Sequence, residues 1–246
     1  MKNAILFFQL FAILSCSSGQ VSKKENKADL YFRQGGVYLN RNEYAKALGV
    51  LLKAKGLSPK RDDVLSALAL AYYYKGSQSQ AIKSLREAIK LAPKITEHKN
   101  NLGTIYLESN QFDQAEKIYQ EVIKDLSYEN SFLAYYNLGI LEEKRNNMVA
   151  AHHYFSKSAK EGSYCVAYYK LGQHSLNQSR HEEAIGHLKK STLRGCFQNP
   201  EHHLLLAIAY FRSNKKSIAK IKFKEIMQNH PESNQAKEAL KYMSRF

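Results

Sequence analysis

The sequence predicts an all-α solenoid of six helix–turn–helix repeats followed by a capping helix. The first observation is an alanine that recurs with spacings of 34, 34, 36, 33 and 35 residues, at Ala47, Ala81, Ala115, Ala151, Ala184 and Ala219. The second is a small residue 12 positions before each alanine, at Gly35, Ala69, Gly103, Gly139, Gly172 and Ala207. A fixed period near 34 residues indicates a stack of similar helix pairs.

Each period contains the pattern of two amphipathic helices, as the second repeat shows. Leu65, Leu68 and Tyr72 follow each other at three- and four-residue steps, and Gly76 then interrupts the pattern. A second apolar stripe starts at Ala81, and a proline ends it. These signals predict a helix, a turn and a second helix. The small residues are expected where the two helix backbones cross, because a larger side chain would push them apart.

The same pattern divides most of the chain into repeats with these boundaries: 28–61, 62–95, 96–131, 132–164, 165–199 and 200–231. Asn199 and Pro200 predict an N-cap and a first-position proline at the start of the sixth repeat. Beyond it, residues 232–246 carry one more apolar stripe, formed by Ala236, Ala239, Leu240 and Met243. We interpret this stretch as a helix that caps the apolar end of the stack.

The repeated residues resemble those of the tetratricopeptide repeat family over about residues 28 to 231. That resemblance implies a right-handed superhelical solenoid that binds another protein. The sequence departs from the family pattern in having no Trp, and Glu142 and Ser175 replace a Tyr in the fourth and fifth repeats.

The N-terminus resembles a bacterial lipoprotein signal. Residues 1–15 combine Lys2 with a short apolar run, which is typical of a signal peptide and too short to span a bilayer. Ile13 and Ser15 match the lipobox that precedes an acylated cysteine, here Cys16. An ordinary secretory peptide with an incidental Cys16 is the alternative. We expect residues 16–27 to form a flexible tether. Lipoproteins that are retained and not exported to the outer membrane commonly carry Asp after the acylated cysteine, whereas this chain has Ser17. The resemblance therefore favours the outer membrane with the repeats in the periplasm, and display on the cell surface is the alternative.

Two further cysteines lie at the ends of the fifth repeat. Cys165 opens its first helix and Cys196 follows its second, and antiparallel helices bring these two ends together. In an exported protein such a pair favours a disulfide. Two free buried thiols are the alternative.

Composition and motifs argue against catalysis. The chain has a formal net charge of +15, with lysines scattered through the helices, so we expect acidic partners or anionic lipid heads, or simply a solvated basic face. Nucleic-acid binding does not suit an exported chain.

The sequence contains no phosphate-binding glycine loop, nucleophile elbow or zinc motif, and the adjacent histidine pairs point apart on a helix. We therefore predict a non-enzyme with no cofactor, no metal and no small-molecule substrate.

The first helix of each repeat carries a second apolar stripe, which the resemblance places on the concave groove of the superhelix. The candidate groove residues are Phe32, Leu39, Leu70, Tyr73, Asn100, Leu107, Tyr136, Ile140, Tyr169, Leu176, Leu204, Ile208 and Phe211. Because these helices already have a core stripe, we interpret the second stripe as surplus to folding and as a partner site. Packing of these residues between neighbouring repeats is the alternative.

The complete layout of signal, tether, six repeats and cap resembles the type IV pilus biogenesis lipoproteins PilF, PilW and Tgl. The resemblance implies a pilotin, an outer-membrane lipoprotein that binds secretin subunits and promotes their localisation and assembly. Two alternatives remain: a BamD-like assembly lipoprotein, whose repeats are less regular, and a periplasmic scaffold for peptidoglycan enzymes.

Overall fold

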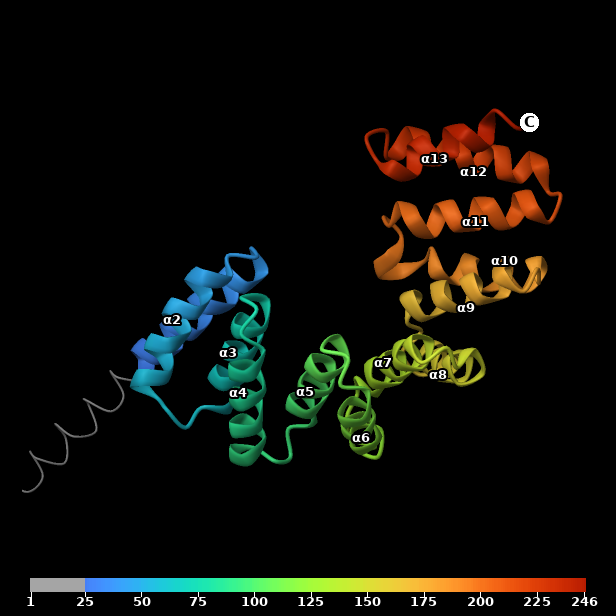
Figure 1. Cartoon of the computed structure of the whole chain (residues 1–246). Helices are drawn as coiled ribbons and strands as arrows, with labels where there is room; N and C mark the ends of the chain where they lie inside the picture. The colour runs from blue at the N-terminus through green and yellow to red at the C-terminus, as the bar shows by residue number, and fades with distance from the viewer. Residues whose placement is uncertain (1–24) are drawn as a thin grey trace, which may run out of the picture. The chain divides into compact units, whose positions relative to one another are not determined.

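The computed structural model describes residues 25–246 and is all-α over that range (Figure 1). A helix covers residues 25–40. The helices that follow it are α2 (Tyr44–Leu57), α3 (Asp62–Tyr74), α4 (Gln78–Leu91), α5 (Thr96–Glu108), α6 (Phe112–Val122), α7 (Ser131–Lys144), α8 (Met148–Gly162), α9 (Cys165–Asn177), α10 (His181–Ser191), α11 (Pro200–Arg212), α12 (Lys216–Asn229) and α13 (Asn234–Met243). A short 3-10 helix, η1 (Arg194–Cys196), lies between α10 and α11.

The described residues form two compact units, one ending at Ile118 and the other running from Tyr119 to Phe246, and the boundary between them lies inside α6. We call them unit 1 and unit 2 and describe each by itself. Helices of one predicted repeat pack as neighbours, namely α3 with α4 in unit 1 and α7 with α8, α9 with α10 and α11 with α12 in unit 2. Each of these repeats therefore contains one packed helix pair.

The predicted signal peptide, Cys16 and most of the tether lie outside the described residues. Residues 25–27, which we expected in the tether, are the first residues of the described helix 25–40, so that part of the prediction is wrong. The helix includes them because Ala28, one residue later, is already buried and anchors this turn to the fold.

The recurrent small residues lie at the helix crossings, as predicted. The six recurrent alanines are all fully buried. A Cβ at Gly139 would lie 2.5 Å from the ring of Phe155, and one at Gly172 would lie 2.4 Å from Leu188. Real Cβ atoms do not approach so closely, so glycine is required for α7 to reach α8 and for α9 to reach α10.

Every turn between the two helices of a pair contains a residue with positive φ. These residues are Asn42, Gly76, Asn110, Asn146, Ser179 and Asn214. Each stands five positions before the recurrent alanine of its repeat. The left-handed conformation ends the first helix and reverses the chain, and glycine and asparagine adopt it at low cost.

The two positions that replace a tyrosine are buried and hydrogen-bonded. Glu142 is 7% exposed and accepts hydrogen bonds from Asn147 Nδ2 at 2.7 Å and from Arg145 at 3.2 Å. The hydroxyl of Ser175 donates to the carbonyl of Leu171 at 3.0 Å. Both polar groups are satisfied, so the packing tolerates the missing rings.

The C-terminal repeat and its cap follow the prediction with one exception. Asn199 caps α11, because its side chain accepts a hydrogen bond from the backbone of Glu201 at 3.0 Å, and Pro200 is the first helical residue. Helix α13 packs on α12 and α11 through Ala236 and Ala239. Leu240, expected on the buried stripe, is 59% exposed, because α13 buries only a narrow face.

A disulfide joins Cys165, the first residue of α9, to Cys196 in η1, and their Cα atoms are 6.1 Å apart. The structure thus contains the bridge that the sequence favours. It ties the segment between α10 and α11 to the start of α9.

Candidate functional site

The predicted groove residues are divided between the two units, and most of them are only partly buried. In unit 1, Phe32, Leu39, Leu70 and Tyr73 keep part of their surface exposed. The other two predicted residues of unit 1 behave differently, since Leu107 is 1% and Asn100 is 6% exposed. The expectation that Asn100 and Leu107 offer surface to a partner is therefore wrong.

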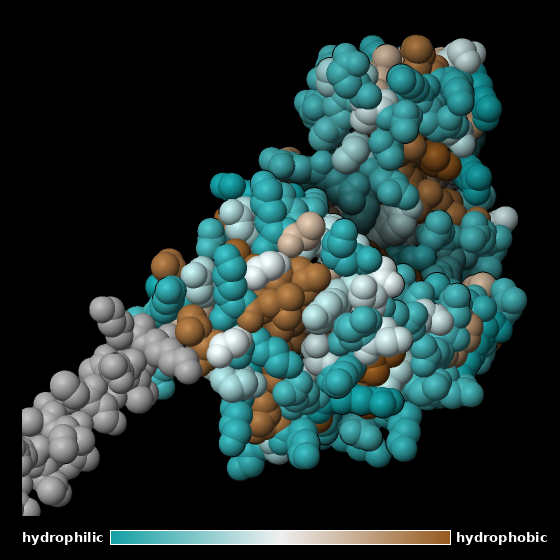
Figure 2. Space-filling view, turned by 60° about the vertical axis from the view of Figure 1, so that its left-hand side comes forward, coloured by the Kyte–Doolittle hydropathy of each residue, from teal (hydrophilic) through white to brown (hydrophobic). Residues whose placement is uncertain are grey.

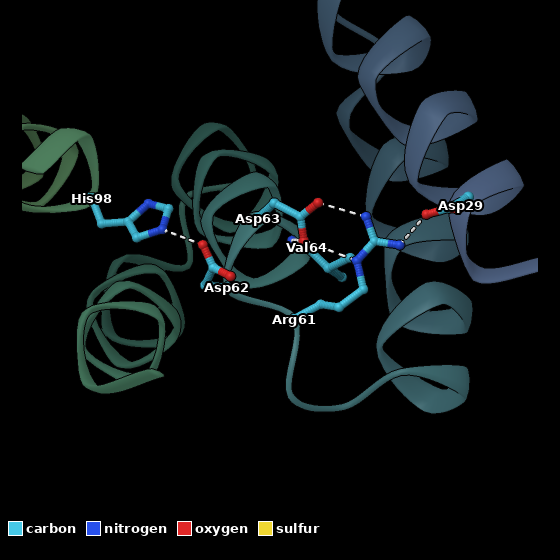
Figure 3. A network of polar contacts seen from close by, with 6 residues as sticks. All are labelled: Asp29, Arg61, Asp62, Asp63, Val64 and His98. Atoms are coloured by element: carbon cyan, nitrogen blue, oxygen red, sulfur yellow. Dashed lines mark hydrogen bonds and ion pairs between the residues drawn. The ribbon is translucent and has the colours of Figure 1, made fainter. Parts of the chain in front are cut away.

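Phe32 packs on Arg61, which belongs to a charged network that spans three helices. Figure 3 shows the polar contacts of this network. The guanidinium of Arg61 lies 5.1 Å from the centre of the Phe32 ring. The same group forms ion pairs with Asp29 of helix 25–40 and with Asp63 of α3. Arg61 also donates hydrogen bonds to Asp63. These bonds raise the pKa of Arg61, so its guanidinium is permanently charged. Because its hydrogen-bonding capacity is used internally, the network positions Phe32 and is not a site for a free anion.

On the far side of α3, the same network reaches α5. His98 Nε2 lies 2.8 Å from Asp62 Oδ2, as Figure 3 shows. His98 is 5% exposed, and within the described residues its Nδ1 has no hydrogen-bond partner. The contact fixes the first turn of α5 against the first turn of α3, which is a structural role.

In unit 2 the partly buried residues lie along α7, α9 and α11. We call this set the inner face of unit 2, and it consists of Tyr136, Ile140, Tyr169, Leu204, Ile208 and Phe211. All of them pack against the buried cores of the unit. The idea that the stripe is surplus to folding is therefore wrong in part, since each side chain supports the core with one side and keeps the other exposed.

Tyr136 shows this double role most clearly. Its ring centre lies 5.6 Å from that of the fully buried Phe155, and it meets the ring of Tyr164 edge-on at 5.3 Å. Burial raises the pKa of Tyr136 to about 12, so the phenol stays neutral. A charged substitution here would damage the core as well as the surface.

Tyr169 is fixed by two contacts with α11. Its ring stacks on that of His202 at 4.5 Å, and its hydroxyl donates to Glu201 Oε1 at 2.7 Å. His202 is 3% exposed, and its Nδ1 donates to the carbonyl of Ser191 at 2.9 Å. Burial lowers the pKa of His202, so this ring is neutral at neutral pH. The pair gives the inner face a rigid aromatic centre.

A polar cluster stands beside the apolar side chains at the end of α7. Glu143 accepts hydrogen bonds from Lys170 Nζ and from His174 Nε2 of α9, both at 2.8 Å. Burial acts to raise the pKa of Glu143, but these hydrogen bonds outweigh it and the pKa is lowered. The carboxylate is consequently charged at neutral pH and links α7 to α9. The candidate groove residues predicted from the sequence include none of these three polar residues, although Lys170 directly follows Tyr169.

The last groove prediction in unit 2 is wrong. Leu176 is 3% exposed and belongs to the buried core with residues of α10 and α11. It lies near the end of α9, where the following helix pair covers it. What remains exposed is an apolar and aromatic face with fixed charges at its side, which suits the binding of an apolar segment of a protein.

The described residues show no metal site and no membrane-spanning helix beside the apolar face. In the space-filling view, apolar surface gathers in patches between larger hydrophilic areas (Figure 2). No group of three or more His, Cys, Asp or Glu side chains within the described range could hold a metal ion. None of the described helices is both long and apolar enough to cross a membrane.

Comparison with known proteins identifies the class. One tetratricopeptide repeat family model matches residues 66–128 and 100–164, and another matches residues 203–233. Together these stretches cover more than half of the 246 residues. The chain belongs to the tetratricopeptide repeat family.

Within that family, the chain is similar to proteins of type IV pilus biogenesis. It is 25% identical over 167 residues to the type IV pilus assembly protein PilF of Pseudomonas aeruginosa, a match that covers 65% of this chain and 66% of that protein. The solved structure of Pseudomonas aeruginosa PilF shares the fold with a TM-score of 0.72 and 20% identity, over 91% of this chain and 100% of the other. The structure of PilW, described as a widely conserved type IV pilus biogenesis factor, matches with a TM-score of 0.69 and 19% identity, over 87% and 98% of the two chains.

Proposed function

We propose that this chain is a non-enzymatic, lipid-anchored protein of the outer membrane that binds secretin subunits and promotes their assembly for type IV pili. The similarity to PilF over 167 residues carries the proposal, because it extends well beyond a single repeat. The sequence motif around Cys16, which lies outside the described residues, supports the lipid anchor. The apolar inner face of unit 2 supplies a surface for a protein partner.

In this mechanism the anchor and the inner face have separate tasks. The acyl chains at Cys16 hold the complex at the outer membrane. Tyr169 and Ile208 contribute exposed apolar surface to the noncovalent contact with a secretin subunit, on a face kept rigid by the stacking of Tyr169 on His202. Preorganised side chains lose little conformational entropy when a partner binds.

The test separates the two tasks. Cys16→Ala removes the anchor, so secretin monomers should still be captured while multimers are not placed in the outer membrane. The double variant Tyr169→Ala and Ile208→Ala should remain in the membrane fraction but lose co-capture of secretin. The matched control is Tyr154→Ala with Ile218→Ala. It removes one tyrosine and one isoleucine side chain from α8 and α12, which are the second helices of their repeats.

The readout is the amount of heat-resistant secretin multimer in outer-membrane fractions, with thermal unfolding of each purified variant to verify its fold. Normal multimers with the inner-face variant would reject this face as the binding site. Normal multimers in a deletion strain would reject the proposed function. In that case defective porin insertion would favour a BamD-like role, and altered cell shape would favour a scaffold for peptidoglycan enzymes.

A further inference from the structure

The segment between α10 and α11 is a short loop held by a covalent bond and by hydrogen bonds. We call residues 192–199 the stapled loop. Its Cys196 is joined to Cys165 at the start of α9. His203 of α11 places its Nε2 2.6 Å from the carbonyl oxygen of Phe197, and the backbone amide of Asn199 donates to Cys196 at 3.0 Å. The loop therefore has a defined shape without any partner.

This fixed loop exposes two large apolar side chains. Leu193 is 56% and Phe197 is 64% exposed. A free loop could fold such side chains inward, whereas the disulfide and the hydrogen bonds hold the backbone of this one in place. Large apolar side chains that a rigid backbone keeps open to water mark a contact surface.

Two lysines precede the exposed apolar side chains of the stapled loop. Lys189 and Lys190 lie in the last turn of α10, just before the loop, and both are exposed. Their ammonium groups lie 6.0 Å and 5.2 Å from the rings of Tyr210 and Tyr168, contacts that leave them able to bind an anion. The sequence has no acidic residue between Glu183 and Glu201. Exposed apolar side chains that closely follow two lysines are the chemistry of segments that enter the headgroup region of an anionic bilayer.

We propose that the stapled loop is a membrane-contact site, in which Leu193 and Phe197 enter the headgroup region of an anionic phospholipid bilayer while Lys189 and Lys190 bind the headgroups. The inference rests on the proposed function, because the anchor at Cys16 would keep the chain at such a surface. The acyl chains at Cys16 attach only the N-terminus, and an apolar and basic contact at the loop would be a second point of attachment. It would also orient unit 2 at the membrane.

The chain offers a matched control for this loop. Leu126, between α6 and α7, is 98% exposed, so it is at least as accessible as Phe197. Its neighbours Asp125 and Glu129 are acidic. If exposure alone directed side chains into a bilayer, Leu126 would enter it too, whereas the proposal requires that it does not.

The experiment uses the absence of tryptophan from the sequence. The full chain is purified from membranes with Phe197→Trp, Leu193→Trp or Leu126→Trp as its single reporter and is reconstituted in vesicles of phosphatidylglycerol or of phosphatidylcholine. Brominated lipids then report contact through quenching. The proposal predicts a blue shift and quenching for both loop reporters in phosphatidylglycerol and for neither in phosphatidylcholine. The reporter at position 126 should show no effect, and Lys189→Gln with Lys190→Gln should reduce the quenching at position 197.

Three results would overturn the proposal. They are unquenched loop reporters in phosphatidylglycerol, equal quenching in both lipids, and equal quenching at position 126. Quenching at the loop reporters but not at position 126 excludes a loop reserved for a protein partner. Secretin multimers are scored separately in cells, so a failure of the loop proposal and a failure of the proposed function are distinguishable.

Discussion

Replacing Gly139 by alanine adds one methyl group at the crossing of α7 and α8. The new Cβ would lie 2.5, 2.6 and 2.9 Å from three ring atoms of Phe155. That ring cannot yield, because it is fully buried and packs against Tyr136 and His174. Overpacking of this kind costs about 1–3 kcal/mol. Alanine regains about 0.5–1 kcal/mol of helix propensity, so we expect a net loss of about 1–2 kcal/mol in the free energy of unfolding.

The matched control is Gly186→Ala in α10, where a Cβ would meet nothing within 4 Å. It should raise stability by about 0.5–1 kcal/mol from helix propensity alone. Thermal and urea unfolding of the full chain, followed by far-ultraviolet circular dichroism, measures both variants. Phe155→Leu in the Gly139→Ala background should cost less than the two single changes together. If Gly139→Ala unfolds at or above the temperature of the unmodified chain, the crossing is not tightly packed and the reasoning is refuted.

Three further predictions concern the turns, the disulfide and the polar cluster around Glu143. Ser179 has a φ of 58°, and Ser179→Asn should raise the free energy of unfolding by about 0.5–1 kcal/mol because asparagine adopts this conformation more easily; a lower melting temperature would contradict it. Cys165→Ser with Cys196→Ser opens a bridge of sequence separation 31 and should lower the free energy of unfolding by about 3–4 kcal/mol. Alkylation of both thiols in exported, unreduced protein would show that no bridge forms there. Glu143→Gln should destabilise the chain by about 1–3 kcal/mol at neutral pH. The pKa of Glu143 in the folded chain is lowered from about 4.5. The stability difference between the two chains should therefore disappear as the pH falls through this lowered pKa. Urea titrations that show an equal difference at acid pH would contradict the ion-pair explanation.

The helix pairs were predictable because their sequence signal is physical and periodic. Only glycine or alanine fits where two helix backbones meet, so residues such as Gly172 and Ala184 locate a crossing without any knowledge of the rest of the chain. The left-handed turn residues carry an equally regular signal. Asn110 and Asn146 stand at the same place in successive repeats, and that signal could have located the turns to the residue.

The inner face was predicted less well, for a reason that depends on the folded chain. Positional spacing identifies which side of a helix a residue is on, but not how far the next helix pair covers that side. Leu176 and Phe211 each stand four residues after the small residue of their repeat, Gly172 or Ala207, yet Leu176 is buried in the core and Phe211 is only partly covered. The contacts of Glu143 with two residues of α9 depend on the separation of α7 and α9, which no local pattern encodes.

The left-handed residue in each turn has a consequence for how such a chain can change in length. Each helix pair contains its own reversal point, five residues before its own recurrent alanine, as Asn42 stands before Ala47 and Asn214 before Ala219. The geometry of one turn therefore depends on no other turn. Duplication or loss of one complete period leaves the reversals on either side intact, whereas the loss of a few residues within a period breaks one. A lineage of such proteins can thus lengthen or shorten its binding face in whole helix pairs, with the capping helix retained at the end.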